Sequence, residues 1–125
     1  MREKKFWLRF AATPRPFSSH FRSWLDTYAK VHTKASTWAG YETAYRVHLL
    51  PFFGALDIRD ITREQVKQWG YEKLQSGLSF SSVQKYLAPL AEMFNHAVED
   101  GYLERSPCLR VLHSNRGGRR TTDNV

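Results

Sequence analysis

The chain of 125 residues contains little that would tie it to an oxidising compartment or to a membrane. Its single cysteine, Cys108, cannot form an internal disulfide, so folding does not depend on an oxidising environment. No apolar run approaches the roughly 18 residues that a membrane-spanning helix needs. The basic N-terminus also lacks the apolar core and the small-residue cleavage site of a secretory signal. We therefore expect a cytoplasmic protein with no membrane partner.

Patterns typical of catalysis and metal binding are missing as well. The 5 histidines contain no HxxxH pair, no zinc-ligand spacing is present, and no glycine-rich GxxxxGK loop is present to hold phosphates. Two acidic pairs, Asp57 with Asp60 and Glu99 with Asp100, lie beside predicted helix ends, where charges that offset the helix dipole are expected. We expect no catalytic residue, no metal, no cofactor and no small-molecule ligand, so that this chain alone is not an enzyme.

The net charge of +7 is distributed unevenly. A basic excess favours polyanionic partners such as nucleic acid or an anionic membrane surface. Residues 1–16 carry a net +4 and residues 113–125 a net +2, whereas residues 17–112 hold 11 basic and 10 acidic side chains. The segment 1–16 is interpreted as a flank, a candidate remnant of an upstream module that contains a candidate short strand over 5–10. Because residues 113–125 contain a Gly-Gly pair and no apolar period, they are predicted to form a flexible linker.

The middle of the chain is rich enough in apolar residues for one compact core, with 42% hydrophobic and 14% aromatic residues overall. Apolar residues at spacings of three and four predict helices over about 17–30, 36–54, 62–77 and 79–101. Gly54, Gly77 and Gly101 are predicted to end three of them, with Gly77 in the left-handed conformation. The predicted fold is an all-α, four-helix domain over residues 17–112, flanked by basic segments.

Cap residues and one proline refine these helices. Thr62 followed by Gln65 is the clearest start, because the pair forms a capping box. Pro89 inside the last helix removes the amide that would bond the carbonyl of Lys85, so we predict a kink there. The predicted N-caps of the four helices are Ser18 or Ser19, Ser36 or Thr37, Thr62, and Ser79.

Two helix beginnings carry side chains suited to phosphate groups. Small hydroxyls and amides near helix N-termini, with lysine or arginine alongside, suit phosphate oxygens because unpaired backbone amides and the dipole point outward there. The alternative is two ordinary helix starts with solvated faces. The aromatic series Trp38, Tyr41 and Tyr45 has the spacing of a core face and is not interpreted as a base-stacking platform. The candidate DNA-binding residues are Lys34, Ser36, Thr37, Thr43 and Arg46 around the second helix and Ser79, Ser81, Ser82, Gln84 and Lys85 at the fourth.

Six runs in a fixed order resemble the core-binding domain of tyrosine recombinases of the phage-integrase type, over about residues 17–110. The resemblance implies a SAM-like orthogonal bundle that lies N-terminal to a catalytic domain and grips the duplex of the recombination site. It places Lys34, Ser36 and Thr37 and also Ser79, Ser81 and Ser82 at the helix starts that face DNA. The runs are Lys34–Glu42, His48–Gly54, Asp57–Thr62, Gly77–Ser79, Asn95–Leu103 and Ser106–Cys108.

The same resemblance implies which partners the chain has and that catalysis belongs to another domain. Partners would be double-stranded DNA of the recombination site and other integrase protomers. The family's catalytic arginine, His-x-x-Arg and tyrosine have no counterpart in this sequence, so DNA integration and excision would require a separate C-terminal catalytic domain. Two departures from the family pattern are Ser106-Pro107 in place of Asn-Pro and Pro89 within the last helix. The alternative function is a SAM-like protein-interaction module without DNA affinity.

Overall fold

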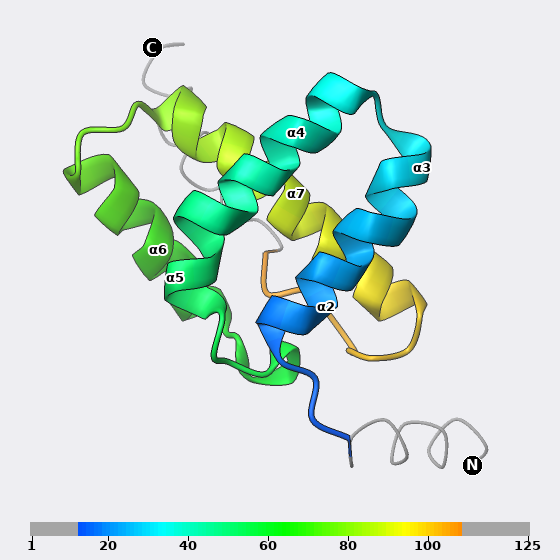
Figure 1. The fold of residues 1–125 in the computed structure, drawn as a ribbon. Helices are drawn as coiled ribbons and strands as arrows, with labels where there is room; N and C mark the ends of the chain where they lie inside the picture. The colour runs from blue at the N-terminus through cyan, green and yellow to red at the C-terminus, as the bar shows by residue number, and fades with distance from the viewer. Residues whose placement is uncertain (1–12, 109–125) are drawn as a thin grey trace, which may run out of the picture.

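A computed structural model describes residues 13–108, and these residues form the four predicted helices (Figure 1). Within the described residues there is no strand, and only one isolated bridge pairs Pro16 with Asp57. The first two helices each contain a wider π-helical segment. The elements in chain order are α2 (Phe17–Trp24), η1 (Leu25–Ala29), α3 (Lys30–His32), α4 (Ala35–Thr43), η2 (Ala44–Leu49), α5 (Leu50–Phe53), η3 (Ile58–Asp60), α6 (Arg63–Gln75) and α7 (Phe80–Glu99).

Two predicted caps are confirmed and two are wrong. Thr62 caps α6 in a complete capping box with Gln65, and Ser79 caps α7 by accepting from the amide of Ser82. The first helix begins after Pro16 instead of Ser18 or Ser19, since a proline needs no amide partner at a helix start. The second begins after Lys34, which leaves Ser36 and Thr37 inside the first turn of α4.

The core runs through all four helices and is strongly aromatic. Phe17 and Phe21 of α2 pack against Tyr45 and Phe53 of the second helix, and the rings of Phe21 and Tyr45 stack at 4.9 Å between centroids. The indole of Trp69 on α6 is fully buried and donates to the carbonyl of His48 at 2.9 Å. These contacts join distant segments, and removing one such ring costs roughly 3–5 kcal/mol in a typical core.

The polar cluster around Asp57, made of Arg15, Asp57 and Arg59, fixes the start of α2 against η3. The Asp57 carboxylate accepts from the backbone amides of Arg15 at 2.7 Å and Arg59 at 2.9 Å, and from the Arg59 guanidinium at 2.9 Å. The hydrogen bond from the Arg59 side chain lowers the pKa of Asp57 well below its usual value. We call these three residues the Asp57 cluster.

Helix α7 is continuous across Pro89, whose ring is fully buried in the core. The predicted bend at this residue stays a prediction. Gly77 adopts the predicted left-handed conformation, with φ of 108°. Cys108 is a free, buried thiol, and its burial raises its pKa to about 12. The predicted strand over 5–10 and the predicted linker over 113–125 lie outside the described residues.

Candidate nucleic-acid interface

The second and fourth helices enclose an open groove of about 600 Å³, which we call the α4/α7 groove. Four of the ten residues predicted from the sequence line it: Ser36, Thr37 and Thr43 from α4 and Lys85 from α7. Segments more than forty residues apart in the chain thus meet on one surface. The remaining lining residues are Ala39, Gly40, Tyr41, Tyr86 and Ala88.

Stacked aromatic rings hold the two walls of the groove in place. The ring of His48 stacks on Tyr86 at 4.2 Å between centroids, and Tyr41 stacks on Trp24 of α2 at 5.9 Å. Burial, followed by the carboxylate of Glu92, raises the pKa of Tyr41, so its hydroxyl stays protonated at neutral pH. The groove is therefore a fixed feature of the helix packing.

Four polar side chains of the groove take no part in the bonding of the fold. Within residues 13–108, no side-chain hydrogen bond or ion pair involves Ser36, Thr37, Thr43 or Lys85. Lys85 is exposed and is the one cation that lines the groove among the described residues. Lys34 is exposed as the N-cap of α4 and makes no ion pair in the described part of the chain. Hydroxyls and ammonium groups in this state can bind an incoming anion without breaking an internal bond.

The other predicted residues differ in their surroundings. Arg46 pairs with Glu42 at 3.1 Å between Nε and Oε2, and Glu42 also meets Arg22 of α2 at 3.7 Å. Ser79 and Ser82 bond each other at the start of α7, so capping occupies both. Ser81 is exposed one helical turn before Lys85, and Gln84 is half-buried; neither lines the groove.

Sequence reasoning missed the aromatic and small residues of the groove. Tyr41, which its spacing placed on the core face with its hydroxyl free to reach the surface, packs against the core, and the half-buried ring also lines the groove. Gly40, Ala39 and Ala88 carry no chemical group that a pattern search could detect. The available signal was the absence of large side chains at exposed positions of α4, which becomes meaningful only when α7 is placed beside it.

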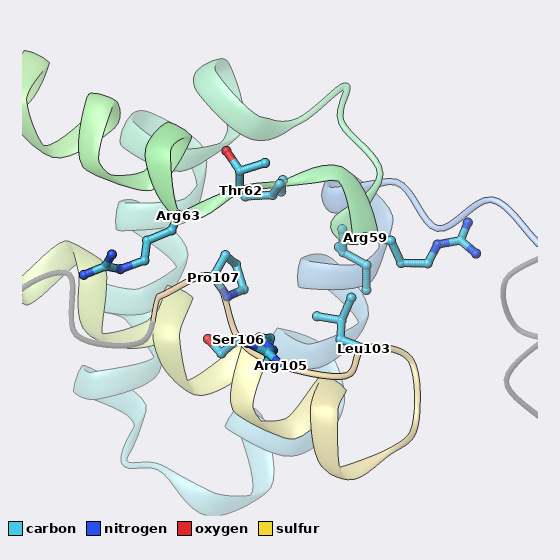
Figure 2. Close-up of a pocket in the computed structure, with 9 residues that line it drawn as sticks. Arg59, Thr62, Arg63, Leu103, Arg105, Ser106 and Pro107 are labelled. Carbon is cyan, nitrogen blue, oxygen red and sulfur yellow. The ribbon is translucent and has the colours of Figure 1, made fainter. Parts of the chain in front are cut away.

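A second pocket of about 490 Å³ lies where η3 and the start of α6 meet the segment after α7. Its lining is apolar at Ile58, Ile61, Leu103 and Pro107, with Arg59, Arg63 and Arg105 around it. In Figure 2 the side chains of Arg59 and Arg63 extend in opposite directions. Arg59 is also held by Asp57 and by the carbonyl of Thr13 at 2.8 Å. These guanidinium groups therefore do not converge on one anion.

Residues 13–108 contain neither a candidate metal site nor a candidate membrane span. No group of three or more histidine, cysteine, aspartate or glutamate side chains is placed to hold a metal ion in that part of the chain. None of the helices described there has both the length and the apolar character needed to cross a membrane.

Comparisons with known proteins agree on one family. A family model described as "Phage integrase, N-terminal SAM-like domain" matches residues 17–74. The solution NMR structure of the phage integrase SAM-like domain from a Moorella thermoacetica protein superposes with a TM-score of 0.64 and 32% sequence identity. That match covers 74% of this chain and 80% of the other. The ICEBs1 integrase of Bacillus subtilis (strain 168) is 26% identical over 82 residues, which are 66% of this chain and 22% of that integrase.

Proposed function

The chain belongs to the family of phage integrase N-terminal SAM-like domains, and we propose that it is a DNA-binding, core-binding domain that grips the duplex of a recombination site. The observation that carries the proposal is the α4/α7 groove. There, three hydroxyls and a lysine lie together without internal partners, although their two helices are far apart in the sequence. Groups of this kind bind the phosphates and sugars that position a protein on DNA.

The proposed contacts to DNA would come from both helices. Ser36 and Thr37 occupy the first turn of α4, where the backbone amides and the helix dipole favour a phosphate. Thr43 lies further along the same wall, and Lys85 faces it from α7. Lys34 extends the basic character beyond the end of the groove. A phosphodiester backbone that follows the groove would meet each of these groups in turn.

The chain spans 22% of the length of the ICEBs1 integrase, so the chemistry of recombination would belong to a partner domain. We place strand cleavage in a C-terminal catalytic domain, with other integrase protomers as partners in the assembled complex, in the cytoplasm. The reading frame beyond Val125 should then encode an arginine, a His-x-x-Arg motif and a tyrosine. A complete gene that lacks them would contradict a role in recombination, whatever this domain binds.

Binding by the domain is expected to be weak, because residues 17–112 carry a net charge of only +1. It should weaken further as salt rises, because Lys34 and Lys85 would neutralise phosphates. The test is fluorescence anisotropy of the full chain with a labelled mixed-sequence duplex of about 30 base pairs, or three helical turns. Lys34→Ala and Lys85→Ala should each lower the affinity and reduce the slope of log K against log salt by about one unit. Lys67→Ala, which removes the same charge from α6, should change affinity much less.

Two outcomes separate the alternatives. If Lys67→Ala weakens binding as much as Lys85→Ala does, the α4/α7 groove is not the docking face. If the folded chain shows no salt-dependent DNA affinity but associates with itself or with a protein partner, the protein-interaction function replaces this proposal. The exposed apolar side chains Val31, Val47 and Tyr71 would be the first residues to substitute in that case.

A further inference from the structure

The fold gives no reason for a glycine at Gly40, which lines the α4/α7 groove. It lies within α4, is exposed to solvent and lines the groove. A Cβ atom built on it would meet nothing within 4 Å, so no packing contact demands a glycine. Its φ is not in the left-handed region, unlike that of Gly77 at 108°. Since glycine is a poorer helix former than alanine, this position lowers the stability of α4 without an internal reason.

Its neighbours indicate what the missing side chain leaves room for. Gly40 follows Ser36 and Thr37 by one helical turn and precedes Thr43 by one turn, so hydroxyls flank it on the same wall. Lys85 stands on the opposite wall. A strand of nucleic acid that bonds both sets of hydroxyls must pass directly over Gly40, and the absence of Cβ allows its backbone to lie closer to the helix.

We propose that Gly40 is a positioning residue, the point at which the sugar–phosphate backbone of DNA approaches α4 most closely. This inference rests on the proposed DNA-binding function and deepens it. The added methyl of an alanine would hold the strand away from the hydroxyls of α4, much as an extra methylene disturbs a well-packed core. The effect is steric, so it should not change the number of phosphates that the protein neutralises.

The chain offers a matched control in Gly70. It lies within α6, a Cβ there would also meet nothing within 4 Å, and it does not line the groove. The same substitution at the two glycines therefore separates what alanine does to a helix from what it does to the docking surface.

The experiment compares Gly40→Ala and Gly70→Ala in the full chain by thermal melting and by anisotropy with the duplex used above. Both variants should melt about 3 to 6 °C higher than the wild type. Only Gly40→Ala should bind more weakly, by about tenfold, with an unchanged salt slope. Gly40→Leu should weaken binding further, whereas Gly70→Leu should not weaken it.

Three results would overturn the inference, and they are distinguishable. If Lys85→Ala weakens binding but Gly40→Ala does not, Gly40 is not a point of close approach, and the proposed function stands. If the wild-type chain does not bind the duplex, both the function and the role of Gly40 fail. A Gly40→Ala variant that melts below the wild type would show that the glycine serves the fold.

Discussion

The Asp57 cluster and the α4/α7 groove use polar side chains in opposite ways. In the cluster, one carboxylate accepts two backbone amides and the guanidinium of Arg59, with atom pairs between 2.7 and 2.9 Å. In the groove, the hydroxyls of Ser36, Thr37 and Thr43 and the ammonium of Lys85 have no side-chain partner within residues 13–108. Both sets of side chains are polar, yet only the first set contributes side-chain hydrogen bonds to the folded state.

The difference predicts that stability and binding can be changed separately. A part-buried charge that loses its partners destabilises the fold, because the groups left behind stay desolvated. An exposed hydroxyl without a partner can be removed at little cost, since water already solvates it in both states. Substitutions in the cluster should therefore lower the free energy of unfolding, and substitutions in the groove should lower DNA affinity.

The largest expected effect is that of Asp57→Ala. It removes the acceptor for Arg15 and Arg59 and should lower the free energy of unfolding by about 3 kcal/mol. Urea denaturation measures this directly. Thr43→Ala is the control from the groove and should change stability by less than about 0.5 kcal/mol. Equal losses of unfolding free energy in the two variants would contradict the proposed difference between the cluster and the groove.

The second prediction concerns pH. His20 is close to the cluster, and its burial, followed by the charge of Arg15, lowers its pKa from 6.5 to about 4. Because the unfolded chain takes up the proton at higher pH, stability should be complete above pH 6.5 and fall as the pH drops toward about 4. The lowered pKa of Asp57 removes further stability in more acidic solution.

Thermal melting across that pH range, with His20→Gln for comparison, tests this prediction. The variant should show a flatter dependence of melting temperature on pH than the wild type. A wild-type profile that is flat between neutral pH and about 4 would mean that His20 is not desolvated by the fold.

A smaller effect is expected at the cap of α6. Thr62→Ala breaks the capping box with Gln65, in which the two hydrogen bonds measure 2.9 and 3.1 Å. The expected loss of stability is about 1 kcal/mol, with no change in DNA affinity. Chemical denaturation gives the first quantity and anisotropy the second; weaker DNA binding would extend the docking face to α6.

The smallest effect on stability is expected at Thr37→Ala. This hydroxyl has no internal partner, and alanine is the better helix former, so the free energy of unfolding should stay constant or rise by a few tenths of a kcal/mol. DNA affinity should fall severalfold in the same variant, as one contact to the backbone is lost. Unchanged affinity would remove Thr37 from the proposed interface.

Much of the fold follows from the sequence because its signals are local. Thr62, Ser79 and Gly77 mark helix ends through interactions within a few residues, and all three predictions are confirmed. The starts of the first two helices were placed wrongly, because Pro16 and Lys34 provide no side-chain cap that a pattern would reveal. The π-helical segments Leu25–Ala29 and Ala44–Leu49 were not predicted from the sequence.

The candidate site was only partly predictable, because it depends on how two helices pack against each other. The hydroxyls near the second and fourth helix starts could be listed, but a linear pattern does not say that Thr43 and Lys85 share a groove while Arg46 pairs with Glu42. Gly40 was not predicted as a site residue, because its proposed role depends on the open space that a side chain would fill. Such properties arise only when two helices are packed together.

Chemical-shift mapping tests most directly whether the α4/α7 groove is the DNA-binding face. The isotope-labelled full chain is titrated with the mixed-sequence duplex, and amide shifts are followed along the chain. We expect the largest changes in α4 and in the first half of α7, with small changes around Arg59, Arg63 and Arg105. The largest changes at those three arginines, with α4 unaffected, would contradict the assignment and move the interface to the second pocket.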